Sequence, residues 1–79
     1  MVHAFIMVKT GSGEFEGLLG SIRGLADVSE AHSVSGDYDL IVEVDAAAVY
    51  EILDVAASEI QGFGGVTDTK TYIAMDESG

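Results

Sequence analysis

Hydrophobic residues in this chain recur with two different periods, and the order in which these periods alternate constrains the fold more than any other feature. A period of two residues predicts a strand, whereas apolar residues at offsets of three, four and seven predict an amphipathic helix. Strand-like patterns cover residues 2–8, 28–34, 38–44 and 66–75, and helix-like patterns cover residues 14–23 and 45–61.

This order of strand, helix, strand, strand, helix, strand predicts an α+β fold of the ferredoxin-like βαββαβ type. In that arrangement the four strands form an antiparallel sheet, and both helices cover one of its faces. A chain of 79 residues has room for one core only, so we expect residues 1–79 to form a single domain.

Turn and capping residues support these boundaries. The run Ser35-Gly36-Asp37 separates the two central strands and is typical of a hairpin turn. Ser12 and Asp45 are expected to cap the two helices at their N-termini. We interpret Gly17 and Gly20 as positions where the first helix packs closely on the sheet. The expected buried stripes are Phe15, Leu18, Leu19 and Ile22, then Val49, Ile52, Leu53, Ala56 and Ile60.

Apolar side chains are also expected on the face of the sheet that no helix covers. The residues placed there are Phe5, Met7, Ile41, Ile73 and Met75. Exposed to water, these side chains would add nothing to the stability of the fold. A chain of this length is more stable if it buries additional apolar surface. A second copy stacking its own sheet on the same face would bury these residues, so we expect a symmetric homodimer.

Charge excludes several classes of partner. Fourteen acidic residues against three basic ones give a formal net charge of -11. Lys9, Arg23 and Lys70 are too few to neutralise the phosphates of a nucleic acid, so neither direct DNA or RNA binding nor binding to an anionic membrane is expected. The acids are dispersed, which favours a solvated surface suited to a salt-rich, halophilic cytoplasm over docking to a basic partner.

The sequence also lacks the features of some kinds of site and of a membrane or secreted protein. It contains no cysteine, which excludes disulfides and thiolate metal sites, and we expect no cofactor. The apolar run at residues 2–8 is too short to span a bilayer and lacks the features of a signal peptide. We therefore expect a cytoplasmic protein.

Three motifs in the correct order resemble one known family. The run Ala31-His-Ser-Val-Ser-Gly-Asp-Tyr-Asp39 is similar to the Ala-His-x-Val-Thr-Gly-x-Tyr-Asp signature of the C-terminal effector domain, or RAM domain, of the Lrp/AsnC regulators. The passage Ile22-Arg-Gly-Leu-Ala-Asp-Val28 and the closing strand Gly65-Val-Thr-Asp-Thr-Lys-Thr-Tyr-Ile73 also resemble that family, as does the opening Ala4-Phe-Ile-Met-Val8. The likeness covers essentially the whole chain, with Ser35 standing where threonine is more usual.

The resemblance implies a function in transcription regulation. Full-length members carry an N-terminal helix-turn-helix, whereas this sequence begins at the first strand of the effector domain. We therefore expect a stand-alone domain that senses an amino acid or related small molecule and acts through a partner, for instance a full-length Lrp/AsnC regulator. The resemblance further implies dimers that assemble into rings, with the ligand at the interface between dimers.

Seven residues are the candidates for ligand binding, because their positions match the family's motifs and their chemistry suits an amino acid. Backbone N–H groups near Ser35 and Gly36 are suited to a carboxylate, and Asp39 to an ammonium. The full set is Ser35, Gly36, Asp37, Tyr38, Asp39, Thr69 and Thr71. A purely structural interpretation stays open, in which Gly36 makes the turn, Asp39 bonds loop amides and the threonines only favour the strand.

Alternative activities have weaker support. His32 has the chemistry of a general base or a pH-sensitive contact but lacks the partners of a catalytic triad, so we interpret it as a hydrogen-bonded interface residue and expect no enzyme. Asp37 and Asp39 are too few oxygens for a hard cation. Thr10-Gly-Ser-Gly13 lacks the lysine of a phosphate-binding loop. A ligand-free assembly domain and, less favoured, an αβ-barrel monooxygenase of the same fold remain alternatives.

Overall fold

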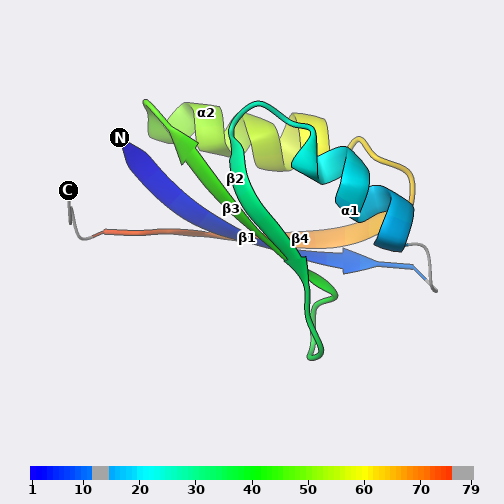
Figure 1. Cartoon of the computed structure of the whole chain (residues 1–79). Coiled ribbons are helices and arrows are strands. Elements are labelled where there is room, and N and C mark those ends of the chain that lie inside the picture. The colour runs from blue at the N-terminus through cyan, green and yellow to red at the C-terminus, as the bar shows by residue number, and fades with distance from the viewer. Residues whose placement is uncertain (12–14, 76–79) are drawn as a thin grey trace.

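The sequence folds into a single sheet with both helices on one side (Figure 1). A computed structural model describes residues 1–11 and 15–75. Along the chain the elements are β1 (Val2–Thr10), α1 (Phe15–Arg23), β2 (Val28–Ser33), β3 (Leu40–Ala46), α2 (Val49–Asp54), the π-helix η1 (Val55–Ile60) and β4 (Val66–Ile73). The strand order is β2-β3-β1-β4 and every pairing is antiparallel, which confirms the ferredoxin-like βαββαβ fold.

The core lies between the sheet and the helices because alternate residues of the two central strands point there. Ile6 of β1 pairs with Val42 of β3, and both are completely buried. Leu18 and Ile22 cover them from α1. The other buried residues are Ala4, Val8, Ala31, Leu40, Val44, Ala46, Ile52, Val55, Ala56 and Ile60.

No helix among the described residues covers the opposite face of the sheet, and we call it the open face. Met7 of β1 pairs with Ile41 of β3 and Lys70 of β4, and Phe5 pairs with Glu43 and Tyr72. Phe5, Met7 and Ile41 therefore lie where the sequence predicts them.

Two residues expected on the open face are not there. Ile73 pairs with Ala4, so it lies on the helix side and packs against the core. Met75 follows the end of β4 and is 89% exposed. The alternation of residues in β4 correctly divides them between two faces, but it does not determine which face meets the helices. In the structure Tyr72, and not Ile73, lies on the open face.

The second helix departs from the prediction at its start. Asp45 belongs to β3 and does not cap a helix, because the strand continues to Ala46. The carboxylate of Glu51 instead accepts hydrogen bonds from the N–H groups of Ala47 and Ala48, at 3.0 and 3.1 Å. This side chain satisfies free donors at the helix N-terminus.

The second helix also buries a different stripe from the predicted one, and its last six residues, Val55–Ile60, form a π-helix. Ile52, Ala56 and Ile60 are buried as expected, but Val49 and Leu53 are exposed and Val55 is buried in their place. Ile52, Val55, Ala56 and Ile60 are themselves at helical spacing, so the helix is rotated about its axis relative to the prediction.

The first helix lies where it was expected, with Leu18 and Ile22 buried and Leu19 partly buried. The close-packing role predicted for Gly17 and Gly20 is wrong, since a Cβ added at either would meet nothing within 4 Å. Ser12 lies outside the described residues, and so does the side chain of Phe15.

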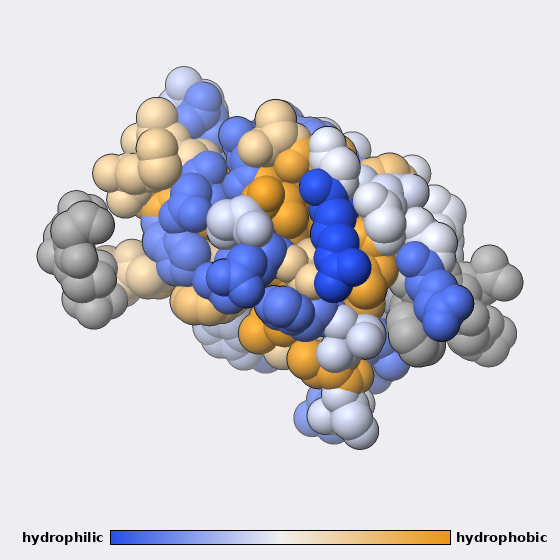
Figure 2. Space-filling view, viewed as in Figure 1, coloured by the Kyte–Doolittle hydropathy of each residue, from blue (hydrophilic) through white to orange (hydrophobic). Residues whose placement is uncertain are grey.

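Hydrophilic and hydrophobic side chains are interspersed on the surface seen in Figure 2. Among the described residues, no helix has both the length and the apolar character needed to cross a membrane.

Candidate functional site

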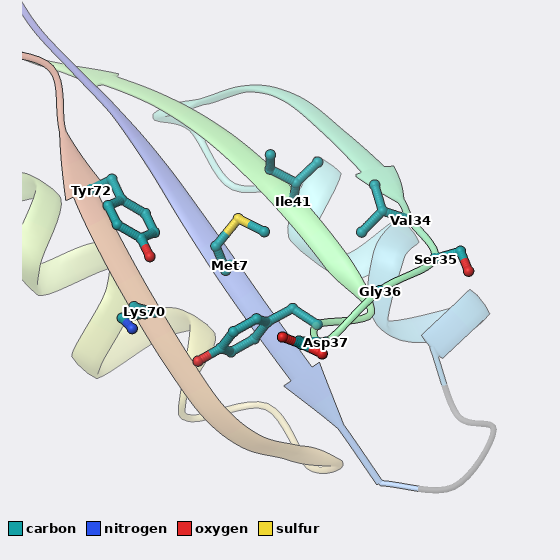
Figure 3. A pocket seen from close by; sticks show the side chains of 9 residues that line it. Met7, Val34, Ser35, Gly36, Asp37, Ile41, Lys70 and Tyr72 are labelled. Carbon is teal, nitrogen blue, oxygen red and sulfur yellow. The ribbon is translucent and has the colours of Figure 1, made fainter.

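A hollow of about 470 Å³ lies at one end of the open face, where the β2–β3 hairpin meets the sheet (Figure 3). We call it the hairpin pocket. Figure 1 shows this hairpin extending past the sheet on the side away from the helices. The lining residues are Met7, Val34, Ser35, Gly36, Asp37, Tyr38, Ile41, Lys70 and Tyr72.

The hairpin loop is held to the end of β1 by Asp39. One carboxylate oxygen of Asp39, Oδ2, accepts hydrogen bonds from the N–H and the hydroxyl of Thr10, at 2.9 and 3.1 Å. The Asp39 backbone N–H donates to the carbonyl of Val8, and the N–H of Val34 donates to the carbonyl of Asp39, each at 2.9 Å. These bonds make a loop of residues 34–39, longer than the three-residue turn that the sequence predicts.

Four of the seven residues predicted to bind a ligand come together in the hairpin pocket. Ser35, Gly36, Asp37 and Tyr38 all line it. Asp39 does not, and its bonds to Thr10 agree with the structural interpretation of that residue.

Thr69 and Thr71 are not brought to the pocket. They pair with Val8 and Ile6, which places them on the helix side of the sheet. The Thr69 hydroxyl accepts a hydrogen bond of 2.7 Å from the amide of Gln61. Ligand binding by these threonines stays a prediction, but their side chains point away from the face that carries the hairpin pocket.

Several pocket residues were missing from the predicted set. Lys70 and Tyr72 alternate with the two threonines and therefore lie on the open face. Met7 and Ile41 were predicted on this face but not at a site. The register that pairs Met7 with Lys70 is the signal that would have joined them to the hairpin.

The chemistry of the pocket is mixed. Met7, Val34 and Ile41 supply an apolar wall, and Tyr38 and Tyr72 add aromatic rings. One cationic and one anionic side chain complete the lining, those of Lys70 and Asp37. A small molecule with an apolar part and charged groups of both signs suits this combination.

Neither histidine belongs to the pocket. The Nε2 atom of His32 lies 3.0 Å from a carboxylate oxygen of Glu30, and both side chains are more than half exposed. His32 is thus hydrogen-bonded, as expected, but on the outer strand of the sheet.

His3, interpreted from sequence as an ordinary strand residue, forms a charged cluster on the open face. Its Nδ1 lies 2.5 Å from Asp45 and its Nε2 lies 3.2 Å from Glu43. Its ring also meets Phe5 edge-on, with 5.0 Å between centroids. The hydrogen bond to Asp45 raises the pKa of His3 against an opposing effect of burial, and the same bond lowers the pKa of Asp45.

Comparison with known proteins assigns the domain. The profile of the Lrp/AsnC ligand binding domain matches residues 3–78. The chain belongs to the Lrp/AsnC family. This confirms the resemblance carried by the motifs at residues 31–39 and 65–73.

The Lrp/AsnC chain is similar to regulators and to a shorter protein of the same fold. It is 33% identical over 71 residues to the leucine-responsive regulatory protein of Haemophilus influenzae, covering 90% of this chain and 43% of that one. The crystal structure of a Thermus thermophilus protein superposes with a TM-score of 0.92 at 32% identity, over 98% of this chain and 96% of that one. A Neisseria meningitidis transcriptional regulator in complex with L-Met has the same fold, with a TM-score of 0.85 at 18% identity over 99% of this chain and 52% of that one.

The Lrp/AsnC chain spans less than half the length of the curated regulators that it matches, between 43% and 48%. The matched part is the ligand-binding domain of transcription regulators, so the family supports a regulatory role in sensing small molecules.

Proposed function

We propose that this Lrp/AsnC domain senses an amino acid or a related small metabolite in the hairpin pocket and regulates transcription through a partner chain. The observation that carries the proposal is the pocket itself, because four motif residues, 35–38, line it together with an apolar wall and two opposite charges. The leucine-responsive relative and the regulator solved with L-Met support an amino acid as the ligand.

The partner-mediated part of the proposal rests on charge. A net charge of -11 opposes direct contact with phosphates, so the effect on DNA passes through another chain, such as a full-length Lrp/AsnC regulator of the same cytoplasm. A mobility-shift assay tests this: the domain alone leaves DNA unshifted, and adding it to the regulator changes the regulator's DNA complex. A shift by the domain alone contradicts the proposal.

The proposed assembly is a homodimer through the open face, and dimers then form a ring. The hairpin pocket, at one end of that face, then places the ligand at the edge of one dimer, where the next dimer meets it. Phe5, Met7 and Ile41 are only partly buried in the single chain, and Tyr72 is 52% exposed, so a second sheet would bury apolar area there. Ligand then shifts the equilibrium between assemblies by binding one of them more tightly.

A thermal-shift screen of the twenty amino acids in high potassium chloride tests the sensing function. A ligand at a hundred times its Kd stabilises the folded state by about 2.7 kcal/mol, which moves the Tm of a short chain by several degrees. We expect one or two amino acids to do so.

Two tyrosine variants provide the matched comparison. Tyr38→Ala removes a side chain from the pocket and is expected to abolish the shift, whereas Tyr50→Ala removes one from exposed helix α2 and is expected to retain it. If no amino acid changes the Tm over a wide concentration range, sensing is wrong and the ligand-free assembly domain replaces it.

A further inference from the structure

Both histidines of the chain lie on the open face, and each contacts carboxylates there. His3 of β1 pairs with Asp45 of β3, and His32 of β2 pairs with Ile41, a register that places both rings on this side of the sheet. Every ion pair among residues 1–11 and 15–75 involves one of these two histidines. Their protonation therefore decides how the acids around them are compensated.

Two acids of the open face are direct cross-strand partners. Glu30 of β2 pairs with Glu43 of β3, and like charges at opposite positions of neighbouring strands destabilise a sheet. The Nε2 atom of His32 lies 3.0 Å from Glu30, and the Nε2 atom of His3 lies 3.2 Å from Glu43. His3 also meets Asp45 through Nδ1, so the two rings connect three carboxylates across β2, β3 and β1. We call these five residues the histidine row.

Charges on the strands of the open face balance only when both histidines are protonated. Apart from the histidines, four acids and two lysines point to this side: Glu30, Glu43, Asp45, Asp68, Lys9 and Lys70. With neutral histidines the acids exceed the lysines by two charges, and protonation of both rings brings the sum to zero. The open face can thus be neutral although the chain as a whole is strongly acidic.

The histidine row is continuous with the proposed dimer interface. Phe5 pairs with Glu43 and meets the ring of His3 edge-on, with 5.0 Å between centroids. In the single chain the side chains of His3 and Glu43 are 35% and 27% exposed. A second sheet that covers Phe5 therefore also removes water from His3 and Glu43.

Charged or titratable groups reach the two histidines from each strand beside them. These groups are Glu43 and Asp45 of β3, Tyr72 of β4, Glu30 of β2 and the N-terminal ammonium group, which adds to the effect of His3 in lowering the pKa of Asp45. The helices pack on the opposite face of the sheet (Figure 1). Carboxylates therefore dominate the surroundings of both rings.

We infer that the open-face dimer is a proton-linked assembly, in which protonation of His3 and His32 favours the association of two copies and neutral histidines weaken it. This inference rests on the assembly in the proposed function and gives that assembly its regulation. The occupant of the face is a second copy of the chain, which brings the same histidine row to the interface.

The direction of the effect follows from desolvation. Water compensates the carboxylates of the row in the single chain, and a covering sheet excludes it, so an unpaired carboxylate costs more in the dimer. Attraction between a protonated histidine and these carboxylates also strengthens when water leaves. The dimer therefore binds more protons than two separate chains, and association strengthens as pH falls through the range in which histidines titrate.

Sedimentation equilibrium at several pH values tests the linkage on the unmodified protein. Molar potassium chloride limits screening lengths to about 3 Å, so that long-range repulsion does not contribute. We expect the dimer Kd to fall about tenfold or more from about pH 8.5 to about pH 6, because proton uptake at several histidines multiplies. Where the dimer is too tight to dissociate, fluorescence-detected subunit exchange is expected to be faster at the higher pH. A Kd and an exchange rate that do not change with pH overturn the inference.

Replacing both histidines assigns the effect to them. His3→Gln combined with His32→Gln is expected to hold the Kd at about pH 6 within about threefold of the unmodified protein's value at about pH 8.5. The N-terminal amino group titrates in the same range, and the dependence that remains in this variant measures its part. Full retention of the pH dependence overturns the role of the histidines. If the double variant does not fold by circular dichroism, each single variant is expected to lose part of the dependence.

Two aspartate variants separate the histidine row from the charge of the whole chain. Asp45→Asn removes an uncompensated carboxylate from the row, so the Kd at about pH 8.5 is expected to fall about threefold or more. Asp54→Asn removes the same charge from exposed helix α2 and is expected to change the Kd by less than about twofold. Equal effects of the two substitutions overturn the inference.

The measurements also distinguish this inference from the assembly on which it rests. A dimer that Phe5→Glu dissociates but that does not respond to pH contradicts the proton linkage alone. A protein that is monomeric at every pH, or a dimer that Phe5→Glu leaves intact, contradicts the open-face interface and the linkage with it. Sensing of a ligand in the hairpin pocket is tested separately by the thermal-shift screen.

Discussion

Asp39 shows how one residue of the motif at 31–39 can hold the hairpin loop in place without lining the pocket. Its carboxylate holds both the N–H and the hydroxyl of Thr10, and its backbone joins the loop to β1 and β2. Tyr38 and Asp37 are its immediate neighbours and line the pocket. Asp39 therefore positions the loop that carries them.

Replacing Asp39 with alanine is expected to lower the free energy of unfolding by about 1.5–3 kcal/mol, because Thr10 loses a charged acceptor. Asp37→Asn is the control, and as an exposed substitution it is expected to change stability by no more than about 0.5 kcal/mol. Urea denaturation measures both. Equal stability of the two variants would contradict the role of Asp39. Ligand binding by Asp39→Ala should also weaken, through the displaced loop.

His3 and Asp45 form a hydrogen-bonded pair outside the pocket. Their hydrogen bond raises the pKa of His3 above its ordinary 6.5 and lowers the pKa of Asp45 below its ordinary 3.8. The stabilisation linked to His3 is complete below pH 6.5 and is lost as pH rises through the raised pKa. The part linked to Asp45 is complete above pH 3.8 and is lost as pH falls through the lowered pKa.

His3→Gln should therefore cost most stability between these two values and progressively less at alkaline pH. Urea denaturation of the variant and the unmodified protein from acid to alkaline pH measures the difference. The side chains of His3 and Asp45 are 35% and 38% exposed, so solvent screening keeps the effect small. His32→Gln is the control, because it makes the same substitution on the outer strand, away from the pair of His3 and Asp45. A His3 difference that is constant with pH would contradict the linkage.

At the scale of the element, the second helix is rotated about its axis relative to the stripe that the sequence predicts. Leu53 has the right spacing for an α-helical stripe, yet it is 50% exposed, while Val55 is 2% exposed. The predicted and observed stripes share Ile52, Ala56 and Ile60, and packing on the sheet selects the one that contains Val55.

Alanine substitutions at these two positions test the rotated helix. Val55→Ala is expected to lower the free energy of unfolding by about 1.5–3 kcal/mol, since it removes a fully buried side chain. Leu53→Ala removes a larger side chain from the surface and is expected to cost about 0.5 kcal/mol or less. Thermal or urea denaturation gives both values. A larger loss of stability for Leu53→Ala than for Val55→Ala would favour the stripe that the sequence predicts.

At the scale of the whole molecule, the open face is the surface through which we propose that copies of the chain meet. It joins Phe5, Met7, Ile41 and Tyr72 into an apolar centre. The charged cluster of His3 lies on the same face, and the hairpin pocket lies at one end of it. A dimer formed there would hold both pockets in a defined geometry.

Phe5→Glu is expected to give monomers or unfolded chains, because it places a charge at the centre of the proposed interface. Sedimentation equilibrium measures the mass, and circular dichroism separates dissociation from unfolding. Tyr50→Glu, on the exposed side of α2, is the control and should keep the mass of the unmodified protein. An unchanged dimer with Phe5→Glu would show that the interface lies elsewhere.

The net charge of -11 leads to a prediction about salt. Repulsion among the acids destabilises the compact state, and the screening length falls from about 10 Å at 0.1 M salt to about 3 Å at 1 M. The urea midpoint is therefore expected to rise between low and molar potassium chloride. A midpoint independent of salt would contradict a surface suited to a salt-rich cytoplasm.

Much of the fold was predictable because strands and helices depend on short-range periodicity. The order of six elements, the helix at residues 15–23 and the core positions Leu40, Val42 and Val44 follow from residues close in sequence. The motif at residues 31–39 indicated the family and four residues of the pocket.

Tertiary structure alone decided which face of β4 meets the helices. The alternation of that strand separates Thr69, Thr71 and Ile73 from Lys70 and Tyr72, but either set satisfies it equally well. Pairing with β1 makes the choice, because Ile73 must pack beside buried Ala4 and Lys70 must avoid that core.

Pairing between residues distant in sequence also explains the His3–Asp45 bond and the position of Lys70, which the sequence did not indicate. His3 meets Asp45 across 42 positions of the chain, and Lys70 joins Met7 and the hairpin through strand register. Short-range patterns determined the elements and their amphipathic sides. The pairing of residues distant in sequence determined the contents of the pocket, because side chains from four separate segments must converge there before it has any chemistry.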